Sequence, residues 1–310
     1  MKITIMGTGG VGGYFGGLLA RDNPDVTFIA RGEHLAAIQA KGLQVNSQND
    51  GTFTVYNAAT DDPSSLPKQD LILFTVKMFD NIAAMDSIKP IVGDDTTILT
   101  LQNGVSNGYD LSDVFGSERV MIGTAMLEGR ISEPGVVTQG GPGAAHFGEM
   151  YRGISERGKH LLSIFQASNW KVELQENMLD TLWKKFAYLS ACASTCTASN
   201  SSMGEMRSVP ETRDLILNAI AEGFEVGRAY GAPIADDAMD WAISALDNFP
   251  YSGKSSMAKD FAENRAVELE GLTGTVIKMG KRLNINTPIN DMLYAVLKPW
   301  AERINQQNGA

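Results

Sequence analysis

A glycine-rich loop close to the start of the chain constrains the fold more than any other feature. The segment Gly7–Gly12, with the sequence GTGGVG, has the spacing G-x-G-x-x-G. It follows the strand-length apolar segment Lys2–Met6 and precedes Val11–Arg21, whose apolar residues recur at helical spacing. In this context the three glycines permit a tight turn, close approach of the backbone to a pyrophosphate, and packing of the helix on the strand. The loop therefore predicts a dinucleotide-binding unit, and a tight turn without a ligand is the alternative.

The residue that follows the second predicted strand indicates which dinucleotide is bound. A protein that binds NAD places an Asp or Glu about 20 residues after the loop, where it accepts a hydrogen bond from the ribose 2′-hydroxyl. Here the strand Val26–Ala30 is followed by Arg31, a cation that would attract a 2′-phosphate. The pattern predicts NADPH or NADP+ as the cofactor. The nearby Glu33 and a merely surface-exposed arginine are the alternatives.

The first half of the chain alternates strand-length and helix-length segments, which is typical of a parallel sheet with crossover helices. The glycine- and proline-rich segment Glu133–Gly148 is predicted to be an antiparallel addition that closes the sheet. Further strands are predicted at Thr52–Ala58, Asp70–Val76, Thr97–Leu101, Val120–Thr124 and Lys171–Leu174.

After Asn177 the pattern becomes helical throughout. Apolar residues from Leu179 to Phe186 share one helical face, and glycines become rarer. We therefore predict an α/β Rossmann-type, doubly wound domain over residues 1–177 and an all-α domain over residues 178–310. Further helices are predicted at Glu211–Tyr230, Ala235–Leu246, Ser256–Lys281 and Asn290–Gln306.

Charge and composition exclude several classes of partner. The formal net charge is −10, which argues against binding to a nucleic acid or to an anionic membrane. No apolar run approaches the roughly 18 residues that a membrane span requires. The two cysteines, Cys192 and Cys196, cannot form a disulfide framework, and the three histidines lack metal-ligand spacing. These features predict a cytoplasmic protein without a metal site.

Several ordered motifs resemble the ketopantoate reductase (2-dehydropantoate 2-reductase) family, whose fold is like that of 6-phosphogluconate dehydrogenase. The resemblance covers nearly the whole chain. It implies that NADPH reduces a 2-oxo acid, most directly ketopantoate to pantoate, in a cleft between a Rossmann domain and a helical domain. It also leaves open a homodimer formed through the helical domain. Besides the glycine loop, the motifs are Ala30–Gly32, Thr75–Lys77, Leu101–Gly104, Trp183–Phe186 and Ser256–Asp260, with Glu268 and Gly274 downstream.

The resemblance implies a role for particular residues. Lys185 corresponds to the catalytic lysine that donates a proton to the carbonyl oxygen, and Glu268 corresponds to the glutamate that works with it. Ser256 corresponds to a substrate-binding serine. Asn103 corresponds to a residue that lines both the nicotinamide region and the substrate. The cofactor contacts implied are Gly7, Thr8, Gly9, Gly10, Val11, Gly12, Arg31, Lys77 and Asn103.

Periodicity alone leaves alternatives to three of these assignments. Lys184 flanks the same apolar stripe as Lys185 and could be the proton donor instead. Glu268 lies in a charged segment that could be a solvated helix face. Ser256 could be a helix N-cap as well as, or instead of, a substrate contact.

The sequence also departs from the family pattern. Members of the family carry substrate-facing asparagines four and eight residues after the catalytic lysine, where this chain has Leu189 and Ala193. Thr273 stands where asparagine is frequent. These changes preserve the reductase chemistry but alter the expected substrate selectivity. A 2-hydroxy acid dehydrogenase that acts oxidatively and a catalytically silent dinucleotide sensor are the alternative functions.

Overall fold

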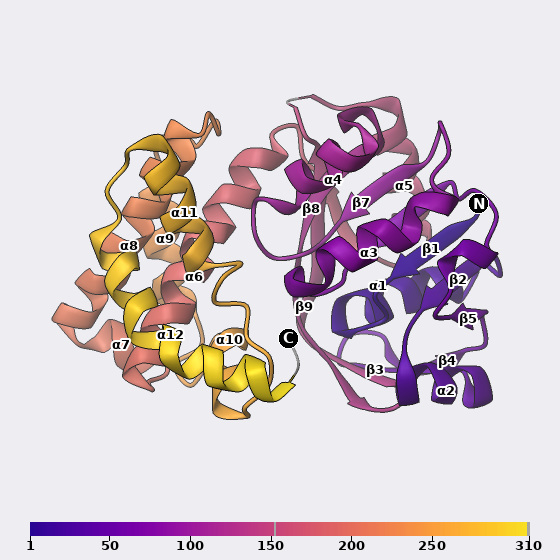
Figure 1. Cartoon of the computed structure of the whole chain (residues 1–310), viewed down its shortest axis with the longest axis horizontal. Helices are drawn as coiled ribbons and strands as arrows, with labels where there is room; N and C mark the ends of the chain where they lie inside the picture. Colours follow the sequence, from indigo (N-terminus) through magenta and orange to yellow (C-terminus); the bar gives the residue numbers. More distant parts are fainter. Residues whose placement is uncertain (152, 309–310) are drawn as a thin grey trace. The chain divides into compact units, whose positions relative to one another are not determined.

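A computed structural model describes residues 1–151 and 153–308, which form two compact units (Figure 1). The first unit spans Met1–Met178, and the second begins at Leu179. The strands of the first unit are β1 (Ile3–Met6), β2 (Val26–Ile29), β3 (Leu43–Ser47), β4 (Gly51–Val55), β5 (Ala59–Thr60), β6 (Leu71–Phe74), β7 (Thr97–Thr100), β8 (Val120–Glu133), β9 (Val136–Glu149) and β10 (Lys171–Leu174). Its helices are α1 (Gly10–Ala20), α2 (Gly32–Lys41), α3 (Asn81–Ile88), α4 (Asn107–Phe115) and α5 (Glu156–Ala167).

All ten strands belong to one sheet, in the order β4-β3-β9-β8-β7-β6-β1-β2-β5, with β10 paired to β9. The five central strands β8, β7, β6, β1 and β2 are parallel neighbours, as expected for a doubly wound sheet. The antiparallel pair of β8 and β9 extends the sheet, and the two halves of β9 pair with different strands, β3 and β10. The predicted Rossmann-type fold is confirmed.

Glycines make α1 the centre of the first unit. Every residue of this helix from Gly12 to Ala20 is buried. A Cβ at Gly16 would lie 2.7 Å from Ile5 of β1. On other faces, a Cβ at Gly13 would lie 2.6 Å from Val137, and one at Gly17 would lie 2.8 Å from Val45. The helix is therefore covered by β1 and also by β3 and β9, at distances that only glycine allows.

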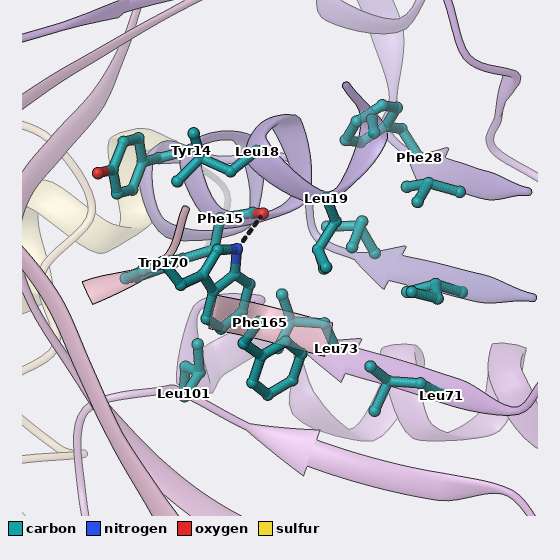
Figure 2. Close-up of a cluster of buried hydrophobic side chains, with 14 of the residues drawn as sticks. Tyr14, Phe15, Leu18, Leu19, Phe28, Leu71, Leu73, Leu101, Phe165 and Trp170 are labelled. Atoms are coloured by element: carbon teal, nitrogen blue, oxygen red, sulfur yellow. Dashed lines mark hydrogen bonds between the residues drawn. The ribbon is translucent and has the colours of Figure 1, made fainter. Parts of the chain in front are cut away.

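Aromatic side chains fill the space between α1 and the end of α5 (Figure 2). Phe165 and Trp170 stack with ring centroids 4.2 Å apart, and Phe15 contacts Trp170 at 4.4 Å. The indole N–H of Trp170 donates to the backbone oxygen of Phe15 at 3.0 Å. This bond satisfies the one polar atom of a tryptophan that is otherwise in apolar surroundings.

The structure corrects the predicted strands in three places. Of the segment predicted as one strand, Thr52–Ala58, residues 52–55 belong to β4, and residues 56–58 are an irregular connection to β5. The strand predicted at Val120–Thr124 continues to Glu133, because its outer half pairs with the first half of β9. Strand β3 was not predicted, although the alternating burial of Leu43–Ser47 is typical of a half-buried strand.

The second unit consists of helices, as predicted. They are α6 (Met178–Ser199), α7 (Met203–Ser208), α8 (Pro210–Ala229), α9 (Ala238–Asn248), α10 (Ser256–Ala262), α11 (Thr273–Leu283) and α12 (Pro288–Asn308). Glu222 of α8 is buried and accepts hydrogen bonds from the backbone N–H groups of Ile289 (2.9 Å) and Asn290 (3.0 Å). A carboxylate from α8 thus satisfies the free N–H groups at the start of α12.

The helix predicted at Ser256–Lys281 is wrong as one helix. Residues 263–272 are not helical, and Asn264 has a positive φ of 52°. The backbone N–H of Val267 donates to Asn305 Oδ1 of α12 at 2.9 Å, which holds the interruption in place. In the described part of the chain, no helix combines the length and the apolar composition needed to cross a membrane.

Candidate functional site

The glycine loop joins β1 to α1 in the geometry that its spacing predicts. Gly7 has a φ of 98°, and a Cβ there would lie 2.8 Å from the backbone nitrogen of Val76. A Cβ at Gly12 would lie 2.2 Å from the backbone oxygen of Gly7. A Cβ at Gly9, in contrast, would meet no atom within 4 Å. The loop is therefore tightly built but open at its second glycine, where a dinucleotide-binding loop lets its backbone approach a pyrophosphate.

Two neighbouring segments hold the loop. The backbone N–H and the hydroxyl of Thr8 both donate to the backbone oxygen of Ile29, at 3.1 and 2.9 Å. The backbone oxygen of Thr8 contacts His34 Nε2 at 2.9 Å, while His34 Nδ1 accepts from the backbone N–H of Gly135 at 2.9 Å. These bonds require a neutral imidazole with its proton on Nε2, and burial lowers the pKa of His34. The oxygen of Thr8 and the N–H of Gly9 belong to one trans peptide group and point in opposite directions. Because the oxygen faces His34, the Gly9 N–H points away from His34.

The β8–β9 hairpin contacts the loop through backbone atoms. A Cβ at Gly10 would lie 2.1 Å from the carbonyl carbon of Gly129 in β8. Gly10 is thus required for packing, whereas Gly9 faces open space. This contact could not be predicted from the motif, because a G-x-G-x-x-G spacing does not constrain the residue after the second glycine.

Arg31 follows β2 and lies beside an acidic residue. It is the N-cap of α2, and its side chain is 61% exposed. Its guanidinium lies 3.7 Å from the carboxylate of Asp80, the last residue of the 3-10 turn Met78–Asp80 after β6. Glu33, the other candidate for a ribose contact, is exposed in the first turn of α2.

Lys77 and Asn103 follow β6 and β7, which are neighbours in the sheet. Lys77 is exposed and Asn103 is half-buried. The glycine loop, Arg31, Lys77 and Asn103 therefore all lie at the carboxyl ends of adjacent parallel strands. In open α/β sheets this edge is where ligands bind.

A buried amide network fixes the loops that carry Lys77 and Asn103. Gln102 Nε2 donates to the backbone oxygen of Val76 and to Asn81 Oδ1, both at 2.7 Å. Asn81 Nδ2 donates to Asn107 Oδ1 at 2.8 Å, and Asn107 Nδ2 donates to the backbone oxygen of Asn103 at 2.7 Å. A supporting role for these residues was not predicted from the sequence. For Gln102, the signal was its position two residues after the end of the buried strand β7.

In the second unit, the side chains of the two adjacent lysines of α6 lie in different surroundings. Lys184 is 16% exposed and lies 3.0 Å from Asp180 and 3.8 Å from Asp237. It is thus a half-buried member of an ion-pair cluster and not an exposed side chain. Lys185 is partly buried, and desolvation lowers its pKa from 10.5 to about 8. A lysine with such a pKa holds its proton loosely enough to act as an acid near neutral pH.

Glu268 and Ser256 lie in places that periodicity did not predict. Glu268 is in the non-helical interruption, half-buried between the buried residues Val267 and Leu269. It is therefore not on a solvated helix face. Ser255, not Ser256, is the N-cap of α10, because the Ser255 hydroxyl accepts from the N–H of Ala258 at 3.1 Å. Ser256 is exposed in the first turn.

The positions that depart from the family pattern differ from one another in burial. Leu189 is half-buried, while Ala193 is completely buried. Thr273 is also completely buried, and its hydroxyl contacts Ser190 (3.4 Å) and Ser194. Of the three, only position 189 keeps contact with solvent.

Comparison with known proteins agrees with this fold. Residues 3–152 match the family model described as ketopantoate reductase PanE/ApbA, and residues 177–301 match the model of its C-terminal domain. The chain is 29% identical to the 2-dehydropantoate 2-reductase of Pyrococcus horikoshii, over 96% of this chain and 97% of that protein.

Solved structures give the same result. A PanE/ApbA family ketopantoate reductase from Ralstonia eutropha is similar with a TM-score of 0.89 and 30% identity, covering 98% of this chain and all of that one. D-mandelate dehydrogenase with NADH and anilino(oxo)acetate shares the fold, with a TM-score of 0.88 and 21% identity over 98% and 100% of the two chains.

The fold and its relatives place this chain among the oxidoreductases that use a nicotinamide dinucleotide and act on CH–OH groups or the corresponding carbonyls. Because the two family models together cover most of its length, the chain belongs to the ketopantoate reductase family.

Proposed function

We propose that this protein reduces a 2-oxo acid to the 2-hydroxy acid with NADPH, and that ketopantoate or a close relative is the substrate. The observation that carries the proposal is the desolvation of Lys185 in α6, which lowers the pKa of this side chain to about 8. A sensor that only bound a dinucleotide would have no use for a lysine tuned in this way.

The chemistry assigns a task to each residue. A bound reduced nicotinamide would supply the hydride for the carbonyl carbon, and negative charge would then develop on the carbonyl oxygen. Protonated Lys185 stabilises this charge and donates its proton to the oxygen, which completes the alcohol. Glu268 orients the ammonium group, and Ser256 binds the substrate. Asn103 contacts both the nicotinamide region and the substrate.

In the first unit, the glycine loop binds the pyrophosphate and Arg31 binds the 2′-phosphate. Lys77 lines the ribose region. The open space at Gly9 and the 61% exposure of Arg31 support these roles. Replacing Arg31 with Ala should weaken binding of NADPH by about 1.5–3 kcal/mol through loss of a charge-assisted contact, and NADH much less. Equal losses for both cofactors would contradict the assignment of NADPH.

The substrate is tested with a panel of 2-oxo acids and the purified protein. NADPH binding is measured by fluorescence titration, and turnover is measured by the loss of absorbance of NADPH. Turnover of ketopantoate or of a related branched 2-oxo acid supports the proposal. Binding of NADPH with no turnover of any 2-oxo acid would favour the dinucleotide sensor. Faster oxidation of 2-hydroxy acids than reduction of 2-oxo acids would favour the dehydrogenase.

A cytoplasmic location and a homodimer formed through the second unit belong to the same proposal. Light scattering coupled to size-exclusion chromatography tests the dimer, for which a mass near twice 33.4 kDa is expected.

A further inference from the structure

We propose that Asp80 sets the selectivity of this protein between NADPH and NADH. Its carboxylate opposes binding of the 2′-phosphate at Arg31 and accepts a hydrogen bond from the free 2′-hydroxyl of NADH. This inference rests on the proposed dinucleotide site. It predicts that the wild-type protein uses both cofactors, with a moderate preference for NADPH.

The first observation is the placement of the Arg31–Asp80 pair. In the sheet, β1 lies between β2 and β6, and the glycine loop follows β1. Arg31 follows β2 and Asp80 follows β6, so the 3.7 Å pair joins the two loops on either side of the glycine loop. The adenosine ribose of a bound dinucleotide lies at the end of the second strand. Asp80 is thus a carboxylate at the place where proteins that bind NAD carry one, but it comes from a different strand.

The second observation is that the carboxylate of Asp80 does not cap a helix. Asp80 is the N-cap residue of α3, a position where an aspartate side chain normally accepts a hydrogen bond from the N–H of the second or third helical residue. No such bond forms here. The carboxylate is 37% exposed and lies beside Arg31 instead. Its geometry is explained by that pairing and not by the stability of α3.

Two large apolar side chains close to Asp80 in the sequence are exposed. Phe79 is 48% exposed and Ile82 is 77% exposed, on either side of Asp80 in the sequence. Exposed large apolar side chains beside a cation and a carboxylate match the chemistry of an adenosine, which has an apolar ring face and polar ribose substituents.

The expected effect follows from charge. A 2′-phosphate brings about two negative charges to Arg31, and a carboxylate about 5 Å away repels them even in water. Removing the carboxylate should tighten binding of NADPH by about five- to twentyfold. The same change removes the acceptor for the 2′-hydroxyl and should weaken binding of NADH by about three- to tenfold.

The test compares Asp80→Ala with Asp86→Ala as a matched control. Asp86 is an exposed residue of α3 that pairs with Lys89, so its removal makes the same change in net charge. Dissociation constants for NADPH and NADH are measured by fluorescence titration in low and high salt. We expect the ratio of the two constants to change by at least about fifteenfold in Asp80→Ala and less than about twofold in Asp86→Ala. The gain for NADPH should shrink in high salt, because both groups of the pair are exposed.

The outcomes separate this inference from the proposed function. A wild-type protein that binds both dinucleotides, with a ratio that Asp80→Ala leaves unchanged, overturns the role of Asp80 only. Equal weakening of both cofactors also overturns it, because a merely structural role would act in that way. A folded wild-type protein that binds neither dinucleotide overturns the proposed function and this inference together.

Discussion

Lys185 should titrate within the pH range of an ordinary enzyme assay. With a pKa of about 8, the side chain is about nine-tenths protonated at pH 7 and one-tenth protonated at pH 9. Only the protonated form can donate to the carbonyl oxygen. The value of kcat/KM for reduction should therefore fall about tenfold between pH 7 and pH 9.

Two variants show whether this fall belongs to Lys185. Lys185→Met should lower kcat by about 10² to 10⁴, the usual contribution of a positioned acid, and leave the affinity for NADPH nearly unchanged. Lys184→Met should keep both the turnover and the pH profile. It should cost about 1 kcal/mol of stability, because the half-buried Asp180 loses its ion pair with Lys184. If Lys184→Met is the inactive variant, the assignment of the proton donor is off by one residue.

The titration of Lys185 should also change the free energy of unfolding with pH. Between pH 8 and pH 10.5 the unfolded chain keeps the proton of Lys185 and the folded protein has lost it, so the free energy of unfolding rises with pH. A shift from 10.5 to about 8 corresponds to roughly 3 kcal/mol, and partial contact with solvent reduces it to about 1–3 kcal/mol. Urea denaturation of wild type and Lys185→Met at pH 7 and pH 10 measures this. A stability difference that does not change with pH would refute the desolvation of Lys185.

Three further predictions follow from other parts of the structure. Leu189→Asn should raise turnover of ketopantoate relative to less polar 2-oxo acids by about tenfold, and a wild type that already prefers ketopantoate would contradict this. Ala193→Asn should mainly lower the free energy of unfolding, by about 1–3 kcal/mol, because Ala193 is completely buried. Gln102→Leu removes the hydrogen-bond donor of two buried acceptors and should lower the free energy of unfolding by about 2–3 kcal/mol. Urea denaturation measures this, and a loss well below 1 kcal/mol would show that the amide network does not stabilise the fold. His34→Ala should weaken NADPH and NADH equally, in contrast to Arg31→Ala. Because burial lowers the pKa of His34, wild-type stability should fall as the pH drops below 6.5, and thermal melts of the variant should lack this part of the fall.

The sequence was sufficient to predict those parts of the fold that depend on neighbouring residues. The glycine loop, the strand before it and the helix after it are adjacent in the chain, and their spacing has a direct geometric meaning. Arg31 was also found in this way, since it directly follows a strand whose apolar pattern is clear. Helices α6, α8, α9 and α12 of the second unit were predicted because their apolar faces repeat at helical spacing.

Features that depend on distant partners could not be predicted. The interruption after α10 is held by Asn305, 38 residues beyond Val267, while the local charge pattern still favoured a helix. The role proposed for Asp80 depends on its ion pair with Arg31, which is 49 positions earlier in the sequence. The same holds for the network around Gln102, whose partners follow a different strand. A single sequence shows each of these residues but not its partner.

The packing of α1 has a consequence for the synthesis of the protein. Five of the 11 residues of this helix are glycines, each of which disfavours an isolated helix by about 0.5–1 kcal/mol relative to alanine. The strands that cover it include β9, which ends at Glu149. A nascent chain that stops before this point can make the strand and the loop but cannot enclose the helix. Capacity to bind a dinucleotide should therefore arise late on the ribosome, in one step, when the β8–β9 hairpin has emerged and closed over α1.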